Sequence, residues 1–184
     1  MNKKARGILF LYNGIFVGAA AMLGPLYAIY VLKFVDGVTA VSVSWAAFLV
    51  STSIFTYIVA KKGDGVKEKE YLLLTGYIIR ILSWILLIFV HNLTALVLVQ
   101  ILLGLGESLG TPSFNALFVD HLDKNKHIEE YSNWSLIANL SSAASVLAGG
   151  AIVNNLGFKA LFLFMSALSL IAFLGILLKP RKLL

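Results

Sequence analysis

The chain has 184 residues, of which 59% are hydrophobic and 13% charged, with a net charge of +6 and a mean hydropathy of +0.89. A water-soluble domain of this length could not bury so much apolar surface, because folded proteins leave much of their area in contact with solvent. The surrounding solvent is therefore expected to be lipid. The absence of cysteine excludes disulfides, thiolate metal ligands and cysteine nucleophiles.

Six apolar stretches are long enough to cross a bilayer, which takes about 20 residues per helix. They are Ile8–Leu32, Thr39–Ala60, Tyr71–Val90, Leu93–Val119, Ser132–Val153 and Phe158–Leu178. The sequence therefore predicts an all-α membrane protein in which residues 1–184 form a single six-helix transmembrane domain. The first stretch could instead be a signal peptide behind the basic leader "MNKKAR", but its apolar character continues to Leu32, which favours a retained helix.

The placement of lysine and arginine predicts the orientation in the membrane. Basic residues gather before the first stretch, after the second, after the fourth and in the tail: Lys3, Lys4, Arg6, Lys61, Lys62, Lys67, Lys69, Lys124, Lys126, Lys179, Arg181 and Lys182. Only Lys33 and Lys159 fall on the opposite side. Both termini are therefore expected in the cytoplasm, at a plasma or inner membrane. Because the charges are scattered among loops, they do not indicate nucleic-acid binding.

The two halves of the chain share weak similarities in the same order. The pairs are "GPLYAIY" (24–30) with "GTPSFNALF" (110–118), "SWAAFLVSTS" (44–53) with "NWSLIANLSS" (133–142), and "KEYLLL" (69–74) with "FKALFLF" (158–164). All three share an offset of about 86 to 89 positions, which is typical of an internal repeat. Three helices per copy would make an inverted 3+3 repeat, residues 8–90 and 93–178. Chance likeness between hydrophobic helices is the alternative.

Local motifs carry a family resemblance. The connection "AKKGDGVKEKE" places Asp64 where one transporter family has a loop aspartate, and "QILLGLGESLGTP" keeps Gly104, Gly106 and Pro112 of that family's fourth helix. Gln100 stands where many members have an arginine tied to proton coupling. With "AGGAIVNNLGFKALF" (148–162), these motifs make the chain similar to one half of a major facilitator superfamily transporter.

The resemblance implies a secondary active transporter of a small organic solute that works by alternating access, with possible proton coupling. Members of that superfamily have twelve helices in two such halves, with substrate between them. Six helices would need a second copy, so a parallel homodimer is expected. The alternatives are a truncated twelve-helix protein, a half that pairs with a different half, or a non-transporting membrane scaffold.

A polar stripe marks the fourth predicted helix. Gln100, Gly104, Glu107, Thr111 and Asn115 recur at helical spacing. Such a stripe usually faces a cavity or a partner, although small residues also allow tight helix packing.

Arg80 is the only other charge deep in a span, about 13 Å from the cytoplasmic end of the third helix, whereas Glu107 lies about 18 Å from the same side. The two residues are therefore predicted to form an ion pair, either structural or open to competition by substrate or a proton.

Further candidate substrate-site residues are Asn13 and Tyr27 on the first helix and Asn139 on the fifth, with ordinary packing or interfacial anchoring as the alternatives. The resemblance makes Asp64 a candidate cytoplasmic gate, which would meet the start of the partner's fifth helix. A solvated loop carboxylate is the alternative.

Other chemistry is thinly represented. His121 and His127 match no standard zinc spacing, so no metal or other cofactor is expected. The sequence contains no P-loop and no nucleophile elbow, and the protein is therefore not expected to be an enzyme.

Overall fold

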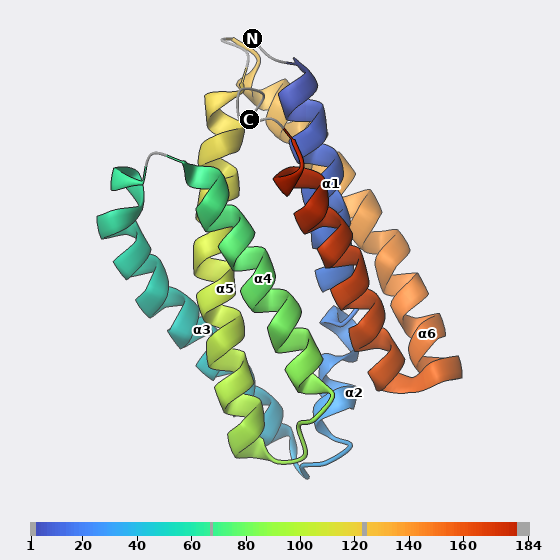
Figure 1. The fold of residues 1–184 in the computed structure, drawn as a ribbon. Coiled ribbons are helices and arrows are strands. Elements are labelled where there is room, and N and C mark those ends of the chain that lie inside the picture. Colours follow the sequence, from blue (N-terminus) through green and yellow to red (C-terminus); the bar gives the residue numbers. More distant parts are fainter. Residues whose placement is uncertain (1–2, 67, 123–124, 180–184) are drawn as a thin grey trace.

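The computed structural model describes residues 3–66, 68–122 and 125–179, and in these ranges the secondary structure is helical without a strand. Figure 1 shows the helices in chain order. They are α1 (Lys3–Ala21), the 3₁₀ turn η1 (Gly24–Leu26), α2 (Tyr27–Val31), α3 (Val38–Lys62), the 3₁₀ turn η2 (Gly63–Gly65), α4 (Lys69–Leu87), α5 (Leu93–Asp120) and α6 (His127–Leu177).

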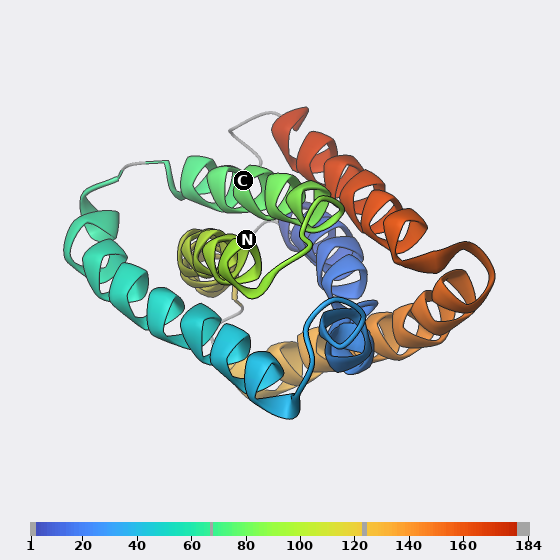
Figure 2. The ribbon, with the colours of Figure 1, turned by 90° about the horizontal axis from the view of Figure 1, so that it is seen from below.

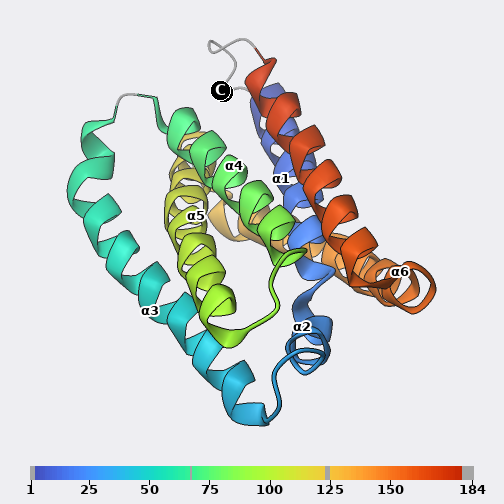
Figure 3. The same ribbon diagram turned by 60° about the horizontal axis from the view of Figure 1, so that its bottom comes forward.

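Five segments of the described chain are long and apolar enough to cross a membrane. They are Arg6–Val31, which combines α1, η1 and α2, and the four helices α3, α4, α5 and α6. The first span bends at η1, where Pro25 occupies the first turn and supplies no backbone N–H to a continuous helix. Figure 3 shows α2 set off from the end of α1 at this turn.

The last of these segments, α6, has 51 residues and is divided by a break. Gly157 has φ 81° and ψ 177°, a left-handed backbone conformation that glycine adopts at little steric cost. The break falls in the connection expected between the fifth and sixth apolar stretches. Beyond it the chain turns back, so α6 consists of a first arm, residues 127–156, and a second arm, residues 158–177 (Figures 1 and 3).

The helices form three layers, seen best along the bundle in Figure 2. α1 and α5 lie in the middle, between α4 with the second arm of α6 on one side and α3 with the first arm on the other. The buried side chains, among them Leu9, Leu73 and Phe118, lie between these layers. The middle helices therefore contact most of the bundle and can position polar groups inside it.

Two helix crossings depend on small residues. A Cβ on Gly18 of α1 would lie 2.6 Å from the Ser141 hydroxyl on the first arm of α6. A Cβ on Gly104 of α5 would lie 2.6 Å from the Ser51 hydroxyl and 2.8 Å from the Thr52 nitrogen on α3. Small side chains let membrane helices approach this closely without relying on a hydrophobic driving force. Each middle helix is thereby packed against one outer helix.

Ion pairs join helix ends on one side of the bundle. Arg6 at the start of α1 pairs with Glu130 at the start of α6, and Lys69 Nζ at the start of α4 lies 3.0 Å from Asp120 Oδ2 at the end of α5. Figure 1 shows these four helix ends together at the top. The same side therefore carries most of the basic residues that the structure describes.

Candidate functional site

The site begins with the close crossing of α4 and α5. A Cβ on Gly76 of α4 would lie 2.6 Å from the Gly110 nitrogen and 2.7 Å from the Gly106 carbonyl oxygen on α5. Only a glycine pair of this kind lets two helix backbones meet. One turn further along α4, the Arg80 side chain crosses over Gly106. A Cβ on Gly106 would lie 2.6 Å from the Cγ atom of Arg80. The close crossing therefore places the Arg80 guanidinium beside Glu107 on α5.

Arg80 and Glu107 form the ion pair that the sequence predicts. Arg80 Nη1 lies 2.7 Å from Glu107 Oε2, and the Thr111 hydroxyl donates to Glu107 Oε1 at 2.5 Å. Both carboxylate oxygens therefore have a partner. The two side chains are 15% and 27% exposed, so Glu107 keeps access to space outside the bundle.

Aromatic rings hold the guanidinium group in place. Its central carbon lies 4.5 Å from the centre of the Phe16 ring and 5.7 Å from the Trp84 ring. Phe16 in turn stacks on Tyr77, with the ring centroids 3.8 Å apart and an interplanar angle of 4°. A cation over an aromatic face is attracted by the ring quadrupole, and more strongly where water is excluded. Arg80 is therefore restrained by α1 and α4 together as well as by Glu107.

A cavity of about 240 Å³ opens beside Arg80 between α1, α4, α5 and the first arm of α6. Its lining residues are Asn13, Phe16, Val17, Tyr77, Arg80, Gly110, Thr111, Phe114, Asn115, Trp134 and Ala138. The Tyr77 hydroxyl donates to Asn13 Oδ1 at 2.5 Å. Asn13 is buried, whereas Asn115 and Thr111 are exposed, so the cavity is lined by the bundle interior on one side and open on the other.

A second, smaller cavity of about 110 Å³ lies on the other side of Arg80. It is lined by Ala20, Leu23, Gly24, Tyr27, Trp45, Phe48, Arg80, Trp84, Gln100 and Leu103. Here the Gln100 amide donates to the Tyr27 hydroxyl at 2.5 Å, and that hydroxyl lies 2.6 Å from the Ser44 hydroxyl. All three side chains are buried. Arg80 lines both cavities and therefore separates them.

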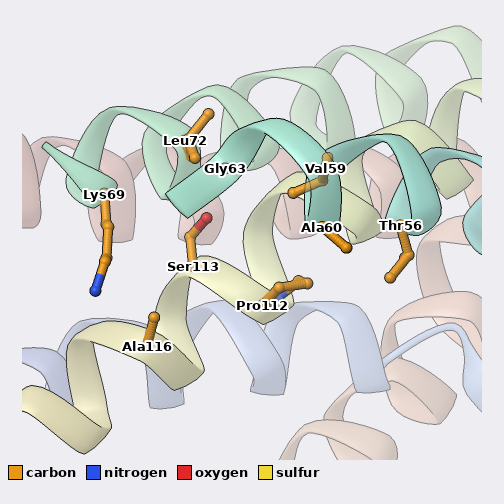
Figure 4. A pocket seen from close by; sticks show the side chains of 9 residues that line it. All are labelled: Thr56, Val59, Ala60, Gly63, Lys69, Leu72, Pro112, Ser113 and Ala116. Atoms are coloured by element: carbon orange, nitrogen blue, oxygen red, sulfur yellow. The ribbon is translucent and has the colours of Figure 1, made fainter. Parts of the chain in front are cut away.

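A third cavity of about 280 Å³ lies near the helix ends, between α3, α4 and α5 (Figure 4). Most of its lining is apolar or small, for example Val59, Leu72 and Ala116, and Lys69 lies at one end. Lys69 already pairs with Asp120. This cavity lacks an intramembrane charge, so the cavity beside Arg80 is the better candidate for solute binding.

Comparison with known proteins identifies the family. The model of the Major Facilitator Superfamily matches residues 4–183, which is nearly the whole chain. The chain belongs to this superfamily. Its members are membrane transporters and not enzymes, so this superfamily member is a membrane protein of a transporter fold. No curated protein matches the chain.

In this superfamily member the candidate residues named from the sequence divide into groups. Asn13, Arg80 and Asn115 line the larger of the two cavities that Arg80 borders, called the larger cavity below, and Glu107 pairs with Arg80 beside it. Gln100 and Tyr27 line the smaller one. Asn139 is exposed on the first arm of α6, next to the cavity-lining Ala138, and lines none of the three cavities described above.

The cytoplasmic gate expected at Asp64 falls partly outside the described structure. The backbone of Asp64 lies in η2, but its side chain lies outside what the structure describes. Among the described residues there is also no group of three His, Asp or Glu that could hold a metal ion.

The polar stripe on α5 winds around the helix. Gln100 is buried at one end, Glu107 is half-buried in the middle, and Asn115 is exposed at the other end. The five stripe residues advance by slightly more than 3.6 residues per step, so the stripe rotates by about 60° from first to last. One stripe therefore serves both cavities and the outer surface.

Sequence reasoning did not identify Tyr77, Phe16 or Trp84 as site residues. A signal existed for two of them, because Tyr77 and Trp84 lie three residues before and four residues after Arg80 and so share its helix face. Phe16 lies three residues after Asn13 on α1 by the same rule. Aromatic side chains one turn from an intramembrane charge are therefore useful candidates for its restraint.

Proposed function

We propose that this chain is a secondary transporter of a small organic solute, in which the Arg80–Glu107 pair is the element that responds to substrate. The observation that carries the proposal is an intramembrane ion pair whose arginine lines a cavity of the helix bundle. Intramembrane charges are costly and usually mark a substrate or ion pathway. A purely structural pair would not need the cavity, or the 27% exposure of the Glu107 side chain.

The proposed topology has six crossings with both ends in the cytoplasm, at a plasma or inner membrane. A continuous 51-residue helix would be about 76 Å long, far more than the roughly 30 Å of hydrocarbon, so each arm of α6 is proposed to cross separately. The basic residues near the ends of α1, α3 and α6 favour the cytoplasm on that side.

The packing supports an inverted 3+3 repeat. Gly18 contacts Ser141, and Gly104 contacts Ser51 and Thr52. Shifting Gly18 by about 86 positions gives Gly104, and shifting Thr52 by about 89 gives Ser141, the same range of offsets as the sequence repeat. The first helix of each repeat therefore packs against the second helix of the other copy, and an inverted pseudo-twofold axis would relate these two contacts to each other.

We propose a parallel homodimer as the working unit. Asn115 and Asn139 are exposed polar side chains on membrane helices, and lipid would leave their hydrogen-bonding groups unsatisfied. A second copy packed on this face would cover them and bring a second Arg80–Glu107 pair to a shared cavity. Asp64 is proposed as the cytoplasmic gate of this assembly, facing the partner's α6 start.

The dimer can be tested by cross-linking, because the chain has no cysteine. Asn139→Cys should be joined to a second chain by a short bifunctional maleimide in membranes. Leu170→Cys, an exposed position on the second arm of α6, is the matched control and should stay unjoined. Equal cross-linking of both variants, or of neither, contradicts the proposed interface.

Proton coupling is proposed at Glu107. Arg80 on α4 is the charged group that meets it, and Tyr77 is the ionisable group one turn before Arg80. The neighbouring segments of α1 (13–18), α3 (48–52) and the first arm of α6 (134–142) carry no ionisable side chain. If a substrate takes Arg80, the carboxylate loses its counter-ion in an apolar setting and takes up a proton.

Reconstitution into liposomes with an imposed proton gradient tests the function. Uptake of a solute from a broad labelled panel should require intact Glu107 and should be stimulated by the gradient. A scaffold, the competing function, predicts no uptake of any solute by a folded protein. The enclosed Gln100–Tyr27–Ser44 cluster fits either function, because its partners all lie within the bundle.

A further inference from the structure

The larger cavity offers hydrogen-bond donors in excess of acceptors. Asn13 accepts the Tyr77 hydroxyl with its Oδ1, which leaves its amide N–H groups as the donors available to a ligand. Arg80 adds a guanidinium with five N–H donors, and Asn115 adds a second amide. The acceptors of Glu107 are engaged by Arg80 and Thr111. A donor-rich wall with a permanent cation is suited to an anionic group.

The rest of the cavity is aromatic. Phe16, Tyr77, Phe114 and Trp134 line it, and Phe114 lies 4.7 Å from Trp134 between ring centroids. Such rings bind a flat apolar body through stacked or tilted contacts. The charged and amide groups are contributed by α1, α4 and α5, which also contribute rings, so a ligand would meet donors and aromatic rings in one cavity.

The volume of the cavity and the charge of the Arg80–Glu107 pair restrict the class of ligand further. The cavity of about 240 Å³ lies below the roughly 300–1,000 Å³ typical of drug-sized pockets, so the ligand is small. The Arg80–Glu107 pair has no net charge, so a ligand carrying one negative charge can be balanced if Glu107 takes up one proton. A dianion would exceed this balance, and a cation would meet Arg80 and the amide donors.

We infer that the transported solute is a small aromatic monocarboxylate, whose carboxylate binds Arg80 in place of Glu107 while its ring lies among the aromatic side chains. This inference rests on the proposed function. In the exchange, the substrate carboxylate takes the guanidinium contact, and Glu107 receives a proton from the aqueous side.

Binding of radiolabelled benzoate to the purified protein, measured by scintillation proximity, tests the inference. Unlabelled benzoate should compete at least about tenfold better than benzamide, benzyl alcohol or benzylamine, because they lack the carboxylate that forms a charged hydrogen bond with arginine. Unlabelled phenylalanine is added to the same competition assay as an aromatic zwitterion, which carries an ammonium group as well as a carboxylate. If benzamide or benzylamine competes as well as benzoate, the inference is overturned.

Substitutions at Arg80 and Glu107 test whether Arg80 is the residue that binds the benzoate carboxylate. Arg80→Gln should weaken benzoate binding by about 10- to 100-fold. The double variant Arg80→Gln/Glu107→Gln, which keeps the pair neutral and the side-chain volume similar, should be equally weak while eluting as folded protein. Leu82→Ala, at an exposed position on α4, is the matched control and should bind as the unaltered chain does. Benzoate binding that survives in the folded double variant overturns the role of Arg80.

Failure of the inference and failure of the proposed function give different results. Gradient-driven uptake of an amine, a zwitterion or a neutral solute, without uptake of benzoate, overturns the monocarboxylate and leaves the transporter in place. No uptake of any panel solute by folded protein in liposomes overturns both.

Discussion

Two polar clusters lie on opposite sides of Arg80, and each contains a side-chain amide bonded to a tyrosine. In the Gln100–Tyr27–Ser44 cluster the side chains are buried and bond one another. In the second cluster, Asn13, Tyr77 and Arg80 line the larger of the two cavities that Arg80 borders, and Glu107 forms a charge pair with Arg80. Both amide–tyrosine pairs are buried, and the second cluster differs because its Arg80–Glu107 pair carries charge and is partly exposed.

The difference indicates that one cluster stabilises the helix packing and that the other cluster responds to a bound solute. Neutral hydrogen bonds between membrane helices contribute on the order of 0.6 kcal/mol each, so the enclosed cluster can fix the packing of α2, α3 and α5 without large strain. An intramembrane ion pair is different, because removing one partner leaves an uncompensated charge. A group that binds Arg80 therefore changes the energy of the second cluster far more than that of the first.

The largest effect is expected from Glu107→Gln. Gradient-driven uptake should fall by about 100-fold or more, because the charged contact with Arg80 is lost and no carboxylate remains to take a proton. Uptake in liposomes, normalised to folded protein by size-exclusion chromatography, is the measurement.

The equivalent change in the enclosed cluster, Gln100→Leu, is the control for Glu107→Gln. Normal uptake by folded Glu107→Gln would show that the pair is structural and that the two clusters do not differ in kind.

A large loss of stability is expected from Gly76→Ala at the α4–α5 crossing. A methyl group there would lie 2.6 Å from the Gly110 nitrogen, a backbone atom that cannot move aside alone. The expected destabilisation is about 1–3 kcal/mol, as for overpacked cores, and is measured as a lower midpoint of thermal unfolding in detergent. Gly150→Ala, where a Cβ meets no atom within 4 Å, should leave the midpoint unchanged.

A smaller loss is expected from Gln100→Leu. Removing the bond to Tyr27 should lower the free energy of unfolding by about 0.6–1.7 kcal/mol, the range for hydrogen bonds between membrane helices. Uptake per folded molecule should stay unchanged. A fall in uptake that exceeds the loss of folded protein would place Gln100 in the solute path and remove the distinction between the clusters.

The smallest effect is expected from Thr111→Val, which keeps the side-chain shape and removes the hydroxyl bonded to Glu107. Losing one hydrogen bond to a carboxylate that retains its arginine should change the half-saturating solute concentration by about two- to fivefold. The concentration dependence of uptake measures it. An effect as large as that of Glu107→Gln would mean that the hydroxyl, and not Arg80, controls the carboxylate.

Hydropathy and helix depth were sufficient to predict the membrane class, the approximate bounds of the first four spans and the Arg80–Glu107 pair. Both charges lie at similar depth on consecutive helices, so their meeting follows from elementary geometry. The break at Gly157 falls in a predicted connection for a similar reason, because hydropathy and the glycine coincide there.

The environment of the pair could not be predicted in the same way. Which residues face Arg80 depends on the rotation of α1 about its axis and on how closely Gly76 lets α4 approach α5. These are properties of packing between helices and leave no period in one sequence. The contact of Phe16 with Arg80 was missed for this reason. The stripe also drifts by about 60° along α5, at about 3.6 residues per turn, and this drift separates Gln100 from Asn115.

The most direct test of the account is the proton stoichiometry of benzoate binding. Purified protein in weakly buffered detergent solution with a pH indicator should take up about one proton per bound benzoate, because charge must balance in the apolar interior. Glu107→Gln should take up none. Benzoate binding without proton uptake, or proton uptake that is unchanged in Glu107→Gln, would contradict the claim that Arg80 exchanges one carboxylate for another.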